Sequence, residues 1–294
     1  MKHSILVLIG CILLMNCTRP ERTLDLQGHR GARGLFPENS LIGFEKTLEI
    51  PEVSTLELDL CITSDHELII SHEPWLNETI CTVNDTTQKG KSYSLYKMTY
   101  DSIQQYDCGS KRHPDFPEQE NATTRKPLLK ELFAEISEKG LRWPNFNVEI
   151  KSQRKGDHKY HPVPRTYASI IVETLNELNE AYPEADLLNK VTIQSADLRT
   201  LREVRKTALQ VRLCLLVEHS AEPAKQMDKL GFPVDVYSPE YTLVTPELIS
   251  WCHFRQIKVI PWTVNELADM QKLVDMGVDG IISDYPNRFA ALVY

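Results

Sequence analysis

Proton-transfer and anion-binding side chains stand together in the segment 27–39, QGHRGARGLFPEN, of this 294-residue chain. His29 and Arg30 follow directly after the apolar entry at residues 24–26, and Gly31 then breaks the predicted strand. Histidine titrates near working pH and arginine binds phosphate or carboxylate oxygens, while glycine lets the backbone approach a ligand closely. Taken alone, the segment fits either an ordinary strand–turn–helix corner or a site with a base and a cation at the end of a strand.

Two further segments alternate between apolar and charged residues, as strands do when their faces meet different environments. In 55–61, TLELDLC, the leucines share one face while Glu57 and Asp59 share the other. In 145–151, NFNVEIK, Glu149 lies on the polar face, opposite the valine and the isoleucine. In a closed parallel barrel the apolar faces suit the helix layer. We therefore expect these carboxylates to point toward the barrel axis.

Carboxylates inside a barrel need a positive partner, because burying each unpaired one costs on the order of several kcal/mol. Oxygen donors from Glu57, Asp59 and Glu149 suit one hard divalent cation, Ca²⁺ or Mg²⁺. The alternative is a salt-bridge network in which Lys151 and Arg30 neutralise the acids.

A second imidazole, His72, ends the predicted strand 68–72, which the pattern places on the same side of the barrel as His29. Two imidazoles beside a cation can divide the acid and base work of a hydrolysis. Arg30 and Lys151 add positive charge where a phosphate would bind. The sequence has neither a Gly-x-Ser-x-Gly elbow nor a phosphate-cradling P-loop, so attack on a phosphodiester fits better than acyl transfer.

The elements that must position these residues repeat a strand-then-helix rhythm. This rhythm predicts an α/β fold, a (β/α)8 TIM barrel formed by residues 24–294. Residues 73 to about 126 are polar and weakly periodic, so we expect a lid or subdomain inserted in the barrel. Further strands are predicted at 191–194, 211–217, 234–238, 258–262 and 280–283, and helices at 40–49, 127–139, 196–207, 221–230, 246–254 and 266–276.

The first residues form a separate unit. Lys2 precedes an apolar run at 5–15 that is too short to span a bilayer but has the length of a signal-peptide core, so 1–16 is predicted to be a signal peptide. The residues Leu-Met-Asn-Cys that end at Cys17 resemble a bacterial lipobox, whose cysteine is acylated. We expect an exported lipoprotein anchored in a bacterial cell envelope, with 17–23 as its tether. Free secretion is the alternative, because Asn16 departs from the usual small residue.

Charge and cysteine content narrow the possible partners. With 41 Asp and Glu against 33 Lys and Arg, the chain is acidic and offers no basic stripe for a nucleic acid. Five cysteines lie beyond Cys17, so at least one stays unpaired if the others oxidise after export. Cys81 and Cys108 share the insertion and are the pair expected to bond.

Several motifs within residues 24–290 resemble those of the glycerophosphodiester phosphodiesterase family in both order and spacing. They are HRG-x5-PEN at His29–Asn39, Glu-Leu-Asp at Glu57–Asp59, Ser71-His72, Val-Glu-Ile-Lys at Val148–Lys151, Trp-Thr-Val-Asn at Trp262–Asn265, and Gly277–Pro286.

The resemblance implies hydrolysis of glycerophosphodiesters to an alcohol and sn-glycerol 3-phosphate, with an insertion that caps the mouth of the barrel and contacts the substrate. It implies His29 and His72 as the acid/base pair. One divalent cation, Ca²⁺ or Mg²⁺, would be held by Glu57, Asp59 and Glu149. The residues expected to bind substrate are Arg30, Glu38, Asn39, Lys151 and Trp262.

Three positions depart from the family pattern. Glu73 replaces the usual aspartate after the second histidine, and one extra methylene there is expected to change the orientation of His72. Ser283 replaces a threonine, which is a harmless change. The loop 154–165 is longer and more basic than usual, and we expect it to contact an anionic head group.

Other functions stay open at this stage. They are a phosphodiesterase that acts on lysophospholipids or phosphoinositide-type head groups, and a non-catalytic lipoprotein that binds phosphoesters. The sequence identifies neither the preferred alcohol, nor the ion, nor the oligomeric state.

Overall fold

The computed structural model describes residues 23–82, 93–208, 210–219 and 222–294. Eight parallel strands form one sheet in the order β8-β7-β6-β5-β4-β2-β1-β9. The end strands are joined by backbone hydrogen bonds from Asp279 N to Val259 O (2.8 Å) and from Ile282 N to Pro261 O (3.0 Å). The predicted (β/α)8 barrel is therefore confirmed. The strands are β1 (Asp25–Gly28), β2 (Thr55–Ile62), β4 (Asn145–Ile150), β5 (Val191–Ser195), β6 (Arg212–Val217), β7 (Val236–Pro239), β8 (Lys258–Val259) and β9 (Gly280–Ser283).

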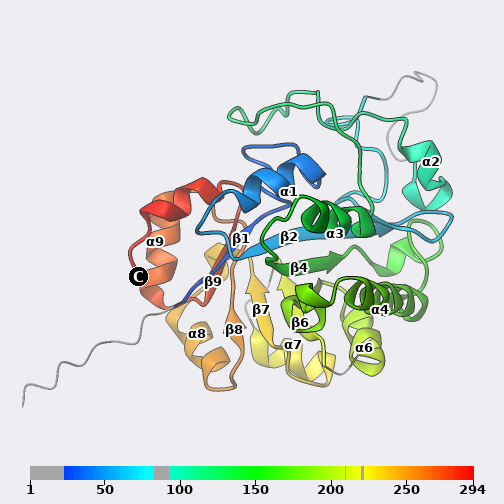
Figure 1. Cartoon of the computed structure of the whole chain (residues 1–294). Coiled ribbons are helices and arrows are strands. Elements are labelled where there is room, and N and C mark those ends of the chain that lie inside the picture. The colour runs from blue at the N-terminus through cyan, green and yellow to red at the C-terminus, as the bar shows by residue number, and fades with distance from the viewer. Residues whose placement is uncertain (1–22, 83–92, 209, 220–221) are drawn as a thin grey trace, which may run out of the picture.

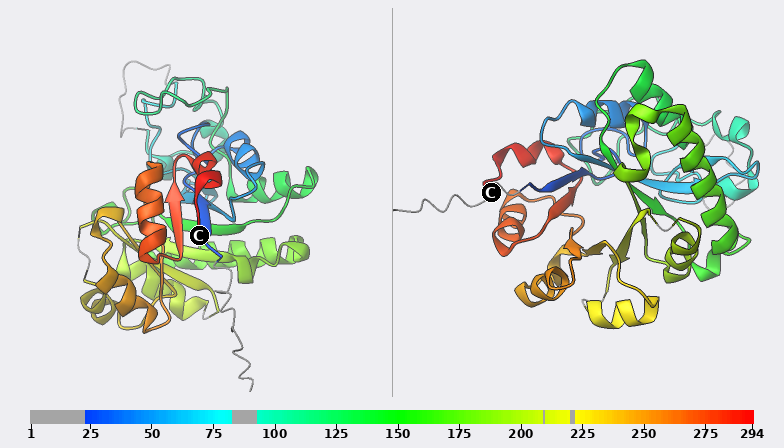
Figure 2. Two further views of the ribbon diagram at one scale, coloured as in Figure 1. Left: turned by 90° about the vertical axis from the view of Figure 1, so that its left-hand side faces the viewer. Right: turned by 60° about the horizontal axis from the view of Figure 1, so that its bottom comes forward.

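Helices surround the strands on the outside, as the right-hand view of Figure 2 shows. The helix α4 (Pro164–Ala181) is the longest of those described and was not predicted from the sequence. The others are α1 (Leu41–Leu48), α2 (Tyr100–Ile103), α3 (Leu129–Glu138), α5 (Leu187–Lys190), α6 (Leu198–Thr207), α7 (Pro223–Leu230), α8 (Pro246–His253) and α9 (Leu267–Met276).

The main hydrophobic core fills the space between strands and helices. Leu56, Leu58 and Leu60 of β2 are fully buried there, in one cluster with Phe133 of α3 and Tyr167 of α4. Each large side chain buried in this way stabilises the fold by about 1.5–3 kcal/mol. The alternation in β2 therefore turns its leucines outward to the helices and its acids inward to the axis, as the sequence predicts.

The insertion begins after β3 (Leu68–Ile70), a strand that pairs antiparallel with the end of β2. It continues to α3 and lies over the loop that follows β1, above α1 in Figure 1. The side chain of Gln119 donates hydrogen bonds to Arg33 O (2.6 Å) and Phe36 O (3.0 Å), which fastens the two segments together.

A disulfide joins Cys81 to Cys108 within the insertion, as predicted. Both residues belong to a second buried cluster with Ile80, Tyr93 and Ile103. The three remaining cysteines of the described chain are buried and free: Cys61, Cys214 and Cys252. The expectation of an unpaired cysteine is thus confirmed.

The predicted signal peptide 1–16, Cys17 and nearly all of the tether 17–23 lie outside the described residues. None of the helices in the part of the chain that the structure describes is long and apolar enough to cross a membrane.

Candidate active site

A cavity of about 350 Å³ opens at the carboxyl ends of the strands. Its lining combines both predicted imidazoles with acids, cations and a few apolar side chains. The residues are His29, Arg30, Arg33, Glu57, His72, Glu149, Lys151, Gln194, Ala196, Leu216, Glu218, Trp262, Thr263 and Ile282. They come from all round the barrel, because strands that run parallel end on the same face.

The three predicted metal ligands meet beside this cavity. β2 and β4 pair in a register that places Asp59 opposite Glu149, and Glu57 lies one alternation earlier on β2. Each of the three residues offers a carboxylate oxygen, and these atoms lie within 4.8 Å of one another. All three residues are buried. Such a set of convergent hard donors fits a cation of the Ca²⁺ or Mg²⁺ type.

Two protein cations also contact the cluster. Lys151 Nζ lies 2.8 Å from Glu149 Oε1 and 3.5 Å from Asp59 Oδ1, and Arg30 Nε lies 3.4 Å from Asp59 Oδ2. Although burial alone would raise the pKa of Asp59, Lys151, His72 and Arg30 hold it well below its usual value. The salt-bridge network that the sequence left open is therefore present around Asp59 and Glu149.

This network does not neutralise the negative charge of Glu57. Its Oε2 accepts the backbone N–H of Arg30 at 2.8 Å. Burial, with the charges of Asp59 and Glu149, raises the pKa of Glu57 well above its usual value. A further positive charge beside this carboxyl group would favour its ionised form. The donor set and the missing charge both fit a divalent cation.

His29 is held from behind by Asp284, whose Oδ1 lies 2.6 Å from Nδ1 of the ring. Burial lowers the pKa of His29 to about 4, and Asp284 opposes this shift only in part. Although burial would raise the pKa of Asp284, His29 and Arg33 lower it, so its carboxylate is charged and can only accept a hydrogen bond. The proton of neutral His29 therefore sits on Nδ1. Its Nε2 stays free as a base, 3.9 Å from Glu57 Oε2.

Two more side chains fix Asp284. Arg33 Nε donates to Oδ1 at 2.7 Å and Asn265 Nδ2 donates to Oδ2 at 2.9 Å. The sequence motifs 262–265 and 277–286 contain Asn265 and Asp284, but their spacing indicated neither the contact of Asp284 with His29 nor its support by Arg33 and Asn265. Their role depends on β9 lying beside β1, which follows from closure of the barrel.

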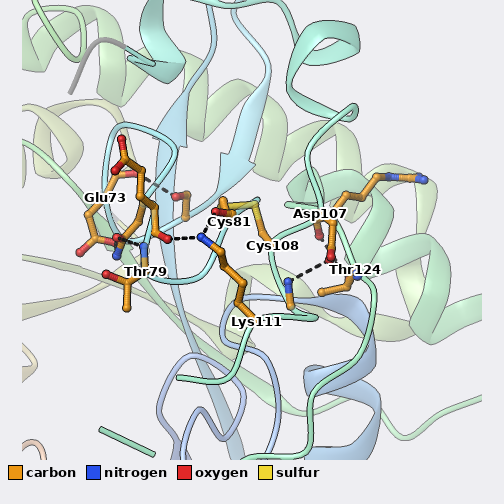
Figure 3. The surroundings of a disulfide bond; sticks show 12 residues. Glu73, Thr79, Cys81, Asp107, Cys108, Lys111 and Thr124 are labelled. Carbon is orange, nitrogen blue, oxygen red and sulfur yellow. Dashed lines mark hydrogen bonds between the residues drawn. A yellow bond between two sulfur atoms is a disulfide. The ribbon is translucent and has the colours of Figure 1, made fainter. Parts of the chain in front are cut away.

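His72 is fixed in the same manner by its neighbour. Glu73 Oε1 lies 2.8 Å from His72 Nδ1, so the longer side chain reaches the ring despite the extra methylene. Burial would raise the pKa of Glu73, but the hydrogen bond and charge of His72 lower it to about 2. Glu73 also belongs to the segment that leads to the disulfide, through Asn77, whose carbonyl accepts Cys81 N at 2.7 Å (Figure 3).

The residues predicted to bind substrate fall into two groups. Arg30, Lys151 and Trp262 line the cavity, and Trp262 is oriented by a 3.0 Å hydrogen bond from Nε1 to Ser238 O. Glu38 and Asn39 lie behind these residues. Glu38 Oε2 pairs with Arg30 Nη1 at 3.2 Å, and Asn39 Nδ2 donates to Asp59 Oδ2 at 2.9 Å. Direct contact of these two residues with substrate stays a prediction.

Comparisons with known proteins agree with this geometry. The sequence profile of the Glycerophosphoryl diester phosphodiesterase family matches residues 29–288. The chain belongs to this family. A glycerophosphodiester phosphodiesterase of Caldanaerobacter subterraneus subsp. tengcongensis is 30% identical over 268 residues, which cover 90% of this chain and 96% of that relative. As a member of the family, the chain is a phosphoric diester hydrolase.

Solved structures share the fold. A crystal structure ascribed to a glycerophosphoryl diester phosphodiesterase of Silicibacter pomeroyi has a TM-score of 0.79 and 26% identity, over 94% of this chain and 96% of that one. A phosphodiesterase of Oleispira antarctica, in complex with the product sn-glycerol-3-phosphate, has a TM-score of 0.70 and 20% identity, over 91% of this chain and 95% of that one.

Proposed function

We propose that the protein hydrolyses glycerophosphodiesters to an alcohol and sn-glycerol 3-phosphate with the help of a divalent cation. The observation that carries this proposal is the pair of imidazoles on one cavity, each with Nδ1 held by a carboxylate, beside three convergent acids. Membership in the family supports the reaction class. The product found in the Oleispira antarctica phosphodiesterase supports sn-glycerol 3-phosphate as the part of the substrate that is retained.

Glu57, Asp59 and Glu149 would hold the cation. When bound, it would neutralise phosphoryl oxygens and polarise the ester, which is the general contribution of a metal to such hydrolysis. Arg30 and Lys151 line the same cavity and offer N–H donors to the remaining phosphoryl oxygens. Their pairing with Glu38, Asp59 and Glu149 keeps these long side chains in place before the substrate arrives.

His29 is the base in this proposal, because burial keeps it neutral and Nε2 faces the cavity. It takes the proton of the attacking oxygen, and Asp284 stabilises the imidazolium that forms. That oxygen belongs either to water or to a glycerol hydroxyl, in which case a cyclic phosphate forms and a water molecule then opens it. His72 is the acid that gives a proton to the departing alkoxide, and Glu73 stabilises its charged form before that transfer. Both carboxylates favour the protonated ring, and it is the burial of His29 that lowers its pKa and keeps it neutral.

The deciding experiment measures sn-glycerol 3-phosphate released from glycerophosphocholine by the purified protein, after chelation and again after Ca²⁺ or Mg²⁺ is restored. We expect activity to disappear on chelation and to return with the ion. Replacing either histidine by alanine is expected to lower kcat by at least about 10²-fold. Full activity in excess chelator would contradict the metal dependence and would favour a metal-independent reaction on the same barrel.

The same assay on lysophosphatidylcholine separates the rival substrate class. Turnover of this lipid faster than of glycerophosphocholine would assign the site to lysophospholipids. If neither substrate is turned over with the ion present, the protein would be one that only binds phosphoesters. It would then lack the activity of its family.

We further propose that the protein is exported and anchored through an acylated Cys17. The basic start, the apolar run and the cysteine at its end support this proposal. The disulfide between Cys81 and Cys108 also supports it, because such bonds persist in oxidising compartments outside the bacterial cytoplasm.

A further inference from the structure

A second chamber of about 280 Å³ adjoins the catalytic cavity. It shares His72, Glu149, Lys151 and Ala196 with that cavity, whereas His29 lines the catalytic cavity and is absent from the residues found around the chamber. His72 therefore stands at the boundary between the two spaces. The residues that belong to the chamber alone are Pro74, Ser152, Gln153, Tyr160 and His161.

One wall of the chamber is a well-fixed loop between β4 and α4. The ring of His161 is buried, its Nε2 accepts Gln153 N at 3.0 Å, and its Nδ1 lies 2.8 Å from Pro162 O. Gly156 packs so closely that a Cβ there would lie 2.4 Å from this ring. Asp157 is held by Arg199 at 2.7 Å. The loop is thus built around His161 and is held by contacts within the protein.

The insertion supplies the opposite wall. The ring of Trp75 packs against the ring of Tyr160, with centroids 5.5 Å apart. Ser94 Oγ lies 3.5 Å from the backbone oxygen of Lys159. Tyr160 is therefore held between the loop and the insertion, and its side chain lines the chamber.

The chamber has a basic rim, by which we mean the residues between Gln153 and Tyr160, two residues that line it. Arg154, Lys155 and Lys159 are exposed, and none of them forms an ion pair with another described residue. The one acid of the loop, Asp157, is already neutralised by Arg199. Lys159 Nζ lies 4.9 Å from the centroid of the Tyr160 ring, so a cation of the protein occupies the aromatic face that would attract a quaternary ammonium group.

We propose that this chamber receives the alcohol half of the substrate and selects alcohols rich in hydroxyl groups over those with a quaternary ammonium group. This inference rests on the proposed hydrolysis, in which His72 gives its proton to the departing oxygen. That oxygen must lie beside His72, and the alcohol attached to it then extends into the space on the far side of the ring. Ser152, Gln153 and Tyr160 offer hydrogen-bonding groups to hydroxyls there, while the basic rim repels a positive head group.

The test compares three substrates: glycerophosphoinositol, glycerophosphocholine and the methyl ester of glycerol 3-phosphate, whose alcohol half is too small to fill the chamber. Tyr160→Ala removes a wall of the chamber. We expect it to lower kcat/KM for glycerophosphoinositol by about 10-fold, the effect of one lost hydrogen bond or packing contact, and to leave the methyl ester within about 2-fold.

The charge of the rim is tested with Lys155→Glu combined with Lys159→Glu. We expect the ratio of kcat/KM for glycerophosphocholine to that for glycerophosphoinositol to rise by about 5-fold at low salt and less at high salt. Lys225→Glu with Lys229→Glu makes the same change of net charge on α7, on the outside of the barrel, and should leave the ratio unchanged.

Equal losses on the inositol and methyl esters in Tyr160→Ala would show that the alcohol lies elsewhere and would overturn the proposal. A ratio that does not change on reversal of the rim charge would overturn the selectivity. If the unaltered protein with its ion hydrolyses none of the three substrates, the proposed function fails, and this inference fails with it.

Discussion

At the scale of single residues, the two imidazoles occupy different electrostatic settings. The His29 side chain is 11% exposed and its partner Asp284 is 1% exposed, whereas the values are 30% for His72 and 21% for Glu73. The drier setting holds His29 neutral, which suits a base. The wetter setting leaves the ring of His72 accessible to solvent.

Asp284→Asn tests the first of these settings. The amide still accepts a hydrogen bond from Nδ1, but it no longer stabilises the imidazolium that forms when His29 takes a proton. We expect kcat to fall by about 10²-fold or more, with a much smaller change in KM, because the group acts through His29 and not on bound substrate. A kcat within 3-fold of the original, in a protein with an unchanged thermal melting curve, would contradict this role.

Glu73 is tested by a pair of replacements. Glu73→Ala removes the acceptor of the His72 hydrogen bond, and we expect about a 10-fold loss of kcat. Glu73→Asp restores the residue type expected from the family pattern and should recover part of that loss. If both variants lose activity equally, the carboxylate does not position His72. The packing of the longer glutamate side chain would then position it.

Several single-residue roles could be predicted from the sequence and others could not. Glu57, Asp59 and His72 stand on or beside strands whose alternation is visible, so their side of the barrel follows from a period of two. Asp284 differs, because its partner His29 is 255 residues away in the chain and the contact depends on how β9 closes against β1. Glu73 illustrates a further limit, since reach depends on side-chain rotamers that no spacing reveals.

At the scale of elements, the register between β2 and β4 creates the acidic cluster, and Glu57→Gln is its sharpest probe. The amide keeps the shape and can accept the Arg30 N–H, but it removes one negative charge. We expect loss of the melting-temperature increase that Ca²⁺ or Mg²⁺ gives the original protein, together with a fall in activity. If Ca²⁺ or Mg²⁺ raised the melting temperature of the variant as much as that of the original, the ion would bind elsewhere.

With chelator present, Glu57→Gln should also change how the stability of the protein depends on pH. A carboxyl whose pKa is raised on folding binds more protons in the native state than in the unfolded one, so the native state loses stability as pH rises from the usual value of 4.5 through the raised value. Glu57→Gln lacks this loss. Its melting temperature should therefore match that of the original near pH 4.5 and exceed it at higher pH.

The disulfide sets the stability of the insertion. It closes a loop with a sequence separation of 27 residues, for which the chain-entropy model gives about 3.5 kcal/mol. We expect Cys81→Ser with Cys108→Ser to lower the melting temperature, and a reducing agent to do the same to the original protein but nothing further to the variant. Because Glu73 lies on the same segment, kcat should fall more than the affinity for the ion.

Among the elements, the barrel was predictable and one helix was missed. The strand-then-helix rhythm continues through most of the chain, and its strands lie close to their predicted positions. α4 escaped the prediction although its buried residues Tyr167, Ile171, Leu175 and Leu178 recur every three or four positions. The predicted strand 258–262 is regular only over Lys258–Val259, although Trp262 still forms an isolated parallel bridge with Glu240.

At the scale of the whole molecule, the described barrel begins at the tether and contains every residue to which a catalytic or metal-binding role is given. β1 starts at Asp25, and its first backbone bond runs from Asp25 N to Asp279 O at 2.9 Å. Removing residues 1–22 therefore takes away none of the described strands, no acid of the cluster and neither imidazole. Location and catalysis should be separable properties of this chain.

Cys17→Ala in the full chain and a version that begins at Thr23 test this separation. If Cys17 is acylated, the first variant should move from the membrane fraction to the soluble fraction of an expressing bacterium, while the original stays with the membrane. Both altered proteins should keep kcat/KM for glycerophosphocholine within about 2-fold, because this water-soluble substrate reaches the cavity without a membrane. Membrane association that survives Cys17→Ala would mean that another feature holds the protein there, since acylation needs this thiol.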